Sequence, residues 1–447
     1  MLGRTPLMLL CEKNHSESFE SCFQHLAERR DVNINAKDYS GANALHSLLE
    51  FNPKISADVV DQLIFERGID TTCKKDGMNM LHLLCKYSQG VETAQVARLL
   101  ILSGIDVHSS STPTGDNALT LLAMNWKTPN FMETVQLLIE KKIDVNHKNQ
   151  HGRNAIQLLI AEKGVDHEIV PEFAQLLITN GLDVNAKNQT GQNIIMELLE
   201  LDDEEIATRK YTVKLIRLLI EANIDVNQKN SIGRSALVTL CGNGSSNNEL
   251  IEIAQLLIEG GATLGGNGEE NALCLLCKSA QDPILLGVAR LLVSKMDFTL
   301  LNEGNPNALH SLFENLNKNQ HILAVANLLI SSKIDVNAVY SDDEGCNVLH
   351  VIFNSYKGND LLDLVRLLIG AGTDVNTLNG AGWNVLHVIC NSYDGKDLLD
   401  LVRLLVEAGI DVGATVVEEK SALNLLWARK DDIPNACTVA QLLIDAV

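Results

Sequence analysis

Residues 41–49 read GANALHSLL, and the phrase returns as GMNMLHLLC at 77–85, GDNALTLLA at 115–123, GRNAIQLLI at 152–160, GQNIIMELL at 191–199 and GWNVLHVIC at 382–390. Variants of it begin at six further positions, which are Gly3, Gly233, Glu269, Asn305, Gly345 and Glu419. Successive copies therefore start 36 to 42 residues apart along the whole chain. A period of this length predicts a stacked repeat solenoid, in which each unit buries its apolar face only against its neighbours.

A second apolar stretch completes each copy, as in VARLLILSGIDV at 96–107. Val96, Leu99 and Leu102 recur there at helical spacing, which predicts an amphipathic packing helix. The unit is therefore expected to consist of a first helix, a loop, a second helix and a finger. Here finger denotes the extended segment, often containing D-V-N, that leads from a second helix to the next copy.

A short polar side chain precedes the apolar run of the first helix in every copy. It is Asn in nine copies, at positions 43, 79, 117, 154, 193, 271, 307, 347 and 384, and it is Thr5, Ser235 or Ser421 in the others. Each of these side chains can accept a hydrogen bond from an orphan amide of the first turn, as a helix N-cap does. The Gly that often stands two residues earlier suits the positive φ of a tight turn.

These elements resemble the ankyrin repeat, and the resemblance covers nearly the whole chain. The first copy reads GRTPLML from Gly3, close to the family's G-x-T-P-L-H opening, and the second-helix Leu pair with D-V-N is similar to the family's L-L-x-x-G-A-D-V-N. The resemblance implies an all-α repeat solenoid of about twelve divergent helix-loop-helix units with extended β-hairpin-like fingers. These units are longer than the family's repeat of about 33 residues, so the loop between the two helices is expected to be enlarged.

The glycine-rich stretch GGATLGGNG at 260–268 is the expected weak joint of the stack. We therefore expect residues 1–264 to hold repeats one to about six. Residues 265–447 would hold repeats about seven to twelve, continuous with the first block through this finger. Proteolysis should nick the chain there first, because glycine-rich exposed segments open most easily.

Composition limits the class of protein. Apolar residues make up 46% of the chain and aromatic residues only 4%, which suits many small aliphatic interfaces better than one large core. No apolar run approaches the roughly 20 residues of a membrane span, so membrane insertion is not expected. Five of the ten cysteines share one first-helix core position, namely Cys11, Cys85, Cys241, Cys277 and Cys390. Such recurrence indicates reduced packing thiols and an intracellular protein, cytoplasmic or nuclear.

The charge of the chain argues against nucleic acid as a partner. A formal net charge of −21 repels phosphate backbones. Charge is also distributed unevenly over the fingers. The early fingers carry Lys37, Lys74, Lys75, Lys148, Lys187 and Lys229, whereas later ones read NEGN at 302–305, YSDDEG at 340–345 and VVEEK at 416–420. One edge of the solenoid is therefore expected to change sign along its length.

Motifs for catalysis or cofactor binding are not found in the sequence. Cys274 and Cys277 form a CxxC without a second pair, which favours core packing over a metal site. The stretch at 260–268 lacks the Lys and Ser or Thr of a phosphate loop, and no G-x-S-x-G occurs. We therefore expect no enzyme activity, no cofactor and no metal.

A recurrent histidine occupies one first-helix position in five copies, at 46, 82, 310, 350 and 387. Helices of neighbouring repeats pack about 8 to 10 Å apart, too far for two such imidazoles to share a metal through bonds of about 2 Å. The resemblance implies instead that this histidine bonds to the backbone and keeps successive fingers in register.

The remaining candidate for function is the surface. The resemblance implies a concave groove, formed by the fingers and the exposed side of the first helices, that binds a protein partner. Tyr39, Tyr340 and Trp383 are finger aromatics outside the apolar pattern, and aromatic side chains are typical contact anchors. The predicted interaction residues are Tyr39, Lys74, Lys75, Lys148, Lys187, Lys229, Tyr340 and Trp383.

Two alternatives stay open. The D-V-N asparagines at Asn146, Asn185, Asn227, Asn337 and Asn376 look like the pattern modified by asparaginyl hydroxylases that act on ankyrin repeats. A structural role is the competing interpretation, in which each Asn bonds across its own finger. Both ends of the chain also look uncapped, although solenoids normally close with polar capping repeats. We accordingly expect either the targeting portion of a larger protein with a catalytic or membrane domain, or end-to-end self-association.

Overall fold

The computed structural model describes most of the chain in two compact units, Met1–Asp225 and Val226–Val447. The described residues are 3–12, 19–29, 31–111, 114–161, 167–200, 210–242, 249–265, 271–279, 284–297, 307–314, 321–339, 345–355, 360–393, 395–415, 421–431, 433 and 435–447. The boundary expected at residues 264 and 265 lies inside the second unit, and residues 266–268 of the glycine-rich stretch are outside the described ranges. That division stays a prediction.

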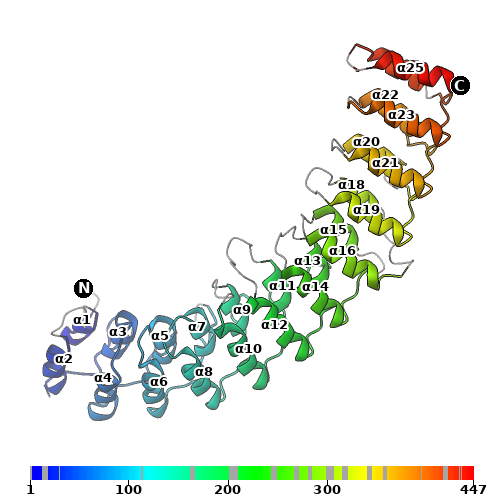
Figure 1. Ribbon diagram of the computed structural model, residues 1–447. Helices are drawn as coiled ribbons and strands as arrows, with labels where there is room; N and C mark the ends of the chain where they lie inside the picture. Colours follow the sequence, from blue (N-terminus) through cyan, green and yellow to red (C-terminus); the bar gives the residue numbers. More distant parts are fainter. Residues whose placement is uncertain are drawn as a thin grey trace. The chain divides into compact units, whose positions relative to one another are not determined.

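The helices of the first unit form two rows that run side by side (Figure 1). The first row packs consecutively through α1 (Pro6–Glu12), α3 (Ala44–Phe51), α5 (Met80–Tyr87), α7 (Ala118–Met124), α9 (Ala155–Ala161) and α11 (Ile194–Leu199). The second row comprises α2 (Phe19–Glu28), α4 (Ala57–Asp61) with the π-helical turn η1 (Gln62–Glu66), α6 (Thr93–Leu102), α8 (Phe131–Glu140), α10 (Ile169–Thr179) and α12 (Lys210–Glu221). The loops between the rows are also linked, since Asn125 Nδ2 donates to Ser88 O at 2.7 Å.

The second unit repeats this arrangement (Figure 1). Its first row is α13 (Ala236–Gly242), α15 (Ala272–Ser279), α18 (Ala308–Glu314), α20 (Val348–Ser355), α22 (Val385–Ser392) and α24 (Ala422–Ala428). Its second row is α14 (Glu249–Glu259), α16 (Ile284–Lys295), α19 (Ile322–Ser331), α21 (Leu361–Gly370), α23 (Leu398–Glu407) and α25 (Ala436–Asp445). In both rows each of these helices packs on the next.

The described regular structure is helical, so the expectation of an all-α protein is confirmed. The β-hairpin-like fingers are not seen: within the described ranges the only β pairing is the isolated bridges Lys75–Met78 and Thr415–Ser421. The finger turns are closed by single backbone bonds, such as that from the Asp38 amide to Ala42 O at 2.9 Å, and by side chains. Asp38 Oδ1 accepts from the amides of Ser40 at 2.8 Å and Ala42 at 3.0 Å. Asx turns of this kind satisfy the amides that a β-ladder would otherwise use.

The two rows bury their side chains differently. First-row helices are covered on most sides, and in α3 every residue from Ala44 to Leu49 is buried. Second-row helices bury only a stripe, which in α6 includes Val96 and Leu100. Leu102, expected on that stripe, is 72% exposed. It follows Val96 by six residues, which on a helix of 3.6 residues per turn displaces it about a third of a turn from the stripe.

Most of the predicted N-caps are confirmed, and the structure shows why most are asparagine. In α5, Asn79 Oδ1 accepts from the amide of His82 at 3.0 Å. Its Nδ2 donates at the same time to Asp106 O, 27 residues onward in the following finger, at 2.8 Å. A Ser or Thr hydroxyl could replace the first bond but would not extend to the second. The lead glycines have the expected positive φ, for example +76° at Gly77.

Candidate functional site

The fingers are held in place by the recurrent histidines of the first helices. His82 Nδ1 accepts from the Asn79 amide at 3.1 Å, and its Nε2 donates to Ser109 O at 2.9 Å. The neutral imidazole with its proton on Nε2 therefore satisfies both bonds. His387 Nε2 donates in the same way to Ala414 O at 3.1 Å. Bonding of this histidine to the backbone of a finger is thus confirmed at His82, His350 and His387.

The D-V-N asparagines link one finger to the next. Asn146 Nδ2 donates to Gly181 O at 2.8 Å, while Asn146 Oδ1 accepts from the Asp183 amide at 2.6 Å. The same pair of bonds recurs at Asn35, Asn227, Asn337 and Asn376, and the Asp225 amide donates to Asn185 Oδ1 at 2.6 Å. The carboxamides bond across copies and not across their own finger, which corrects the competing interpretation. Hydroxylation of these side chains stays a prediction.

Several of the predicted basic contact residues have partners inside the molecule. Lys74 Nζ donates to Ser109 Oγ at 2.9 Å, and Lys148 Nζ donates to Lys187 O at 3.1 Å. Lys75 forms an ion pair with Glu50, and its side chain is only 14% exposed. Lys187 and Lys229 are exposed. The acidic residues expected to reverse the charge of this edge, at 303, 342–344 and 418–419, lie outside the described residues.

The three aromatic candidates are not brought together. Tyr39 is 82% exposed at a finger tip of the first unit, with its ring against Gly3, where a Cβ would come within 3.2 Å of the ring. Tyr340 lies outside the described residues. Trp383 is half-buried in the second unit, in the finger that leads into α22. Trp383 lines a pocket.

Trp383 is held by bonds to its backbone. Asn379 Oδ1 accepts from the Trp383 amide at 2.9 Å, and the Asn379 amide donates to Trp383 O at 2.9 Å. His350, buried in α20, donates from Nε2 to the same carbonyl at 2.9 Å. The indole also lies 6.4 Å, centroid to centroid, from the ring of His387. The backbone that carries this side chain is therefore fixed before any ligand arrives.

The pocket beside Trp383 has a volume of about 300 Å³ and lies between α20, α22 and the finger before α22. Asn354, Asn379 and Asn391 contribute carboxamides to it, and Val388 contributes an apolar wall. None of its described lining residues is Asp, Glu, Lys or Arg, although these make up 21% of the chain. The segments 345–355 and 376–393, which include α20, α22 and the turn before α22, also contain no Asp, Glu, Lys or Arg.

Asn354 and Asn391 occupy the same position at the ends of successive first helices, and both are exposed. Neither carboxamide is hydrogen-bonded to another group in the described part of the chain. Sequence reasoning missed both residues. The available signal was a change of residue type, since the equivalent position is Glu50, Lys86 or Glu314 in other copies.

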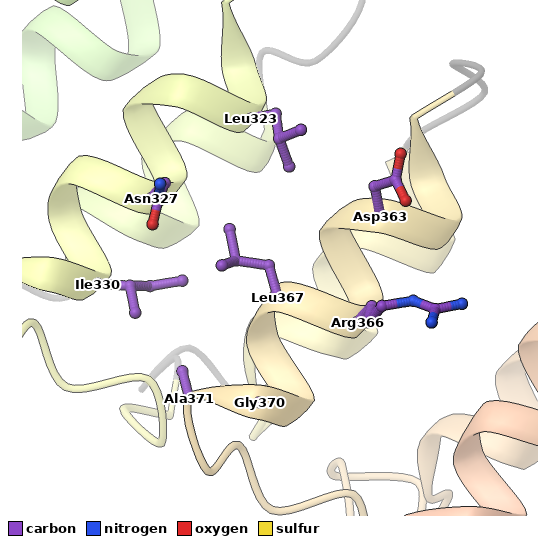
Figure 2. A pocket seen from close by; sticks show the side chains of 8 residues that line it. All are labelled: Leu323, Asn327, Ile330, Asp363, Arg366, Leu367, Gly370 and Ala371. Atoms are coloured by element: carbon purple, nitrogen blue, oxygen red, sulfur yellow. The ribbon is translucent and has the colours of Figure 1, made fainter.

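A second hollow, of about 550 Å³, lies on the other row of the second unit, between α19 and α21. Figure 2 shows Leu323 and Ile330 of α19 pointing toward Leu367 of α21, while the guanidinium of Arg366 extends away from the gap. Gly370 lacks the side chain that Glu140 or Glu407 carries at the equivalent place. Most of the lining of this hollow is aliphatic, and Asn327, Asp363 and Arg366 are its polar members.

A metal site is not found in the described ranges. No group of three or more His, Cys, Asp or Glu there is arranged to hold a metal ion. Burial raises the pKa of the Cys274 thiol to about 12 and that of Cys277 well above its ordinary value. Among the same residues, no helix combines the length and the apolar character needed to cross a membrane.

The chain matches no protein-family model, and no curated protein matches it significantly.

Proposed function

We propose that the protein is an ankyrin-type repeat solenoid that acts as a non-enzymatic scaffold and binds a protein partner along its fingers and first helices. The repeated bonds from Asn79 to Asp106 and from His82 to Ser109 support this architecture, because they recur at the same positions of later copies. Free cysteines in a chain of this kind fit a reducing compartment, so we place the protein in the cytoplasm or nucleus.

The observation that carries the proposal is the uncharged pocket at Trp383. The centres of protein interfaces are depleted in charged residues and enriched in aromatic ones, with Trp prominent among residues whose loss weakens binding most. The backbone of Trp383 is also fixed by Asn379 and His350, so little backbone entropy is lost there when a partner covers it.

Affinity purification with matched variants tests the proposal. The Trp383→Ala variant should lose a partner that the wild-type chain recovers from its native cells. Trp427→Ala is the control, because Trp427 is a 52% exposed indole on α24 and does not line this pocket. Circular dichroism should show that both variants remain helical. Equal recovery of every partner by the wild type and Trp383→Ala would contradict the proposed surface.

A further inference from the structure

The free carboxamides of Asn354 and Asn391 form a pair, because the two residues occupy the same position in successive copies. They project from the ends of α20 and α22, which pack directly on each other, and both line the pocket of Trp383. Packed helices are about 8 to 10 Å apart. A ligand that bonds to both side chains must therefore present equivalent polar groups at about that interval.

Polyproline II geometry meets this requirement. It has three residues per turn and a rise of about 3.1 Å per residue, so carbonyls three residues apart point the same way at a separation of about 9 Å. In a β-strand a similar separation also corresponds to three residues, but residues alternate faces and the two carbonyls would diverge. The backbone of a polyproline II segment makes no internal hydrogen bonds, so its carbonyls are available to the carboxamide donors.

We propose that this pocket binds an uncharged, proline-containing peptide in the polyproline II conformation, an inference that rests on the proposed protein-binding function. The amides of Asn354 and Asn391 donate to carbonyls of residues i and i+3. A proline ring of the peptide packs on the indole of Trp383. The absence of charged lining residues leaves Asp or Lys side chains of a ligand without an ionic partner.

Other common modes of peptide recognition fit these residues less well. Strand addition needs an open sheet edge, and the described residues contain only two isolated β-bridges. A bound amphipathic helix needs a continuous apolar groove, whereas Asn354, Asn379 and Asn391 interrupt the apolar lining of this pocket. Recognition of phosphorylated or acidic motifs needs an arginine cluster, and no arginine lines the pocket. Aromatic-lined grooves for proline-rich segments are the mode that these lining residues match best.

The experiment uses the full chain with Trp126→Phe and Trp427→Phe, so that Trp383 is its single tryptophan. An acetylated and amidated nine-residue proline peptide is titrated while the fluorescence of Trp383 is followed. We expect saturable binding that weakens about 3- to 10-fold in Asn354→Ala and in Asn391→Ala, the range expected for one lost hydrogen bond. Asn391→Gln should retain part of the affinity. Asn327→Ala, an exposed asparagine on α19, should leave it unchanged.

A capped glycine–serine peptide of equal length is the second ligand, and it should bind more weakly because it is not preorganised. Equal affinity for the two peptides, or no effect of either alanine variant, would overturn the polyproline II assignment. If the proline peptide fails to bind while Trp383→Ala still loses a protein partner, this inference falls and the proposed function stands. If the proline peptide does not bind and Trp383→Ala recovers every partner of the wild type, the proposed function falls as well.

Discussion

His350 donates from Nε2 to the carbonyl oxygen of Trp383 at 2.9 Å, so a buried side chain of one first helix holds the aromatic residue that precedes the next. His82 also donates to the following finger, but its acceptor is Ser109 O, 27 residues onward, whereas Trp383 lies 33 residues after His350 and directly precedes the N-cap Asn384. The bond from His350 therefore acts on the candidate site, and the bond from His82 does not.

This relationship predicts different outcomes for two alanine variants. His350→Ala and His82→Ala should each lower the free energy of unfolding by about 1 to 3 kcal/mol, because each removes a hydrogen bond to a finger carbonyl and leaves a cavity in place of a buried imidazole. Only His350→Ala should also increase the mobility of the Trp383 indole. Fluorescence anisotropy in the single-tryptophan background measures this. An unchanged anisotropy in His350→Ala would show that the histidine does not position Trp383.

A second prediction concerns the asparagine that links two fingers. Asn146→Ala removes the bonds to Gly181 O and to the Asp183 amide. These groups are exposed and water replaces part of the loss, so we expect a cost of about 0.5 to 1.5 kcal/mol in urea unfolding. Hydrogen exchange should accelerate at the Asp183 amide and remain unchanged at the Asp225 amide, which Asn185 protects. Equal exchange rates at the Asp183 amide in the wild type and in Asn146→Ala would show that Asn146 does not protect this amide.

The local features of the fold were predictable because their signals are short-range and repeated. Asn before an apolar run predicts an N-cap, and the structure confirms Asn43, Asn79 and Asn384 in that role. Positive φ at a lead glycine such as Gly77 follows from the same turn. Each of these features depends on residues within a few positions in the sequence, so they can be derived without tertiary information.

Features that depend on neighbouring copies were not predictable to the same extent. The sequence does not indicate that Asn146 bonds to the next finger, because a carboxamide has equivalent partners in its own finger. Lys75 was expected on the surface, but Glu50 pairs with it across the finger. The pocket of Trp383 also combines side chains from two successive first helices and a finger. Such combinations depend on how consecutive copies pack.

Thiol reactivity provides a third prediction. Burial raises the pKa of Cys85, Cys241 and Cys390 to about 12, so these thiols remain protonated at neutral pH. Cys22 and Cys437 are exposed. Maleimide labelling followed by mass spectrometry should modify these two first, and denatured protein should be labelled at all ten cysteines. Rapid labelling of Cys85 in the folded protein would show that the first-helix row opens readily.

The buried histidines predict a loss of stability in mild acid. Burial lowers the pKa of His46 to about 4 from an ordinary value of 6.5, and it lowers the pKa of His82 as well. Between these two pH values the unfolded chain binds a proton that the folded chain does not. Each such histidine therefore contributes its full stability above about pH 6.5, and this contribution is lost as the pH falls toward 4.

Replacement of one histidine by glutamine isolates this effect. Gln157 already occupies the same helix position and accepts from the Asn154 amide at 3.1 Å, so glutamine can replace the capping bond without titrating. We expect His46→Gln to reduce the loss of unfolding free energy between pH 7 and pH 5 by about 1 to 2 kcal/mol. Urea unfolding at the two pH values measures this difference. The control variant is His108→Gln, because His108 is an exposed finger residue. An equal pH dependence in the wild type and His46→Gln would mean that proton uptake elsewhere causes the acid destabilisation.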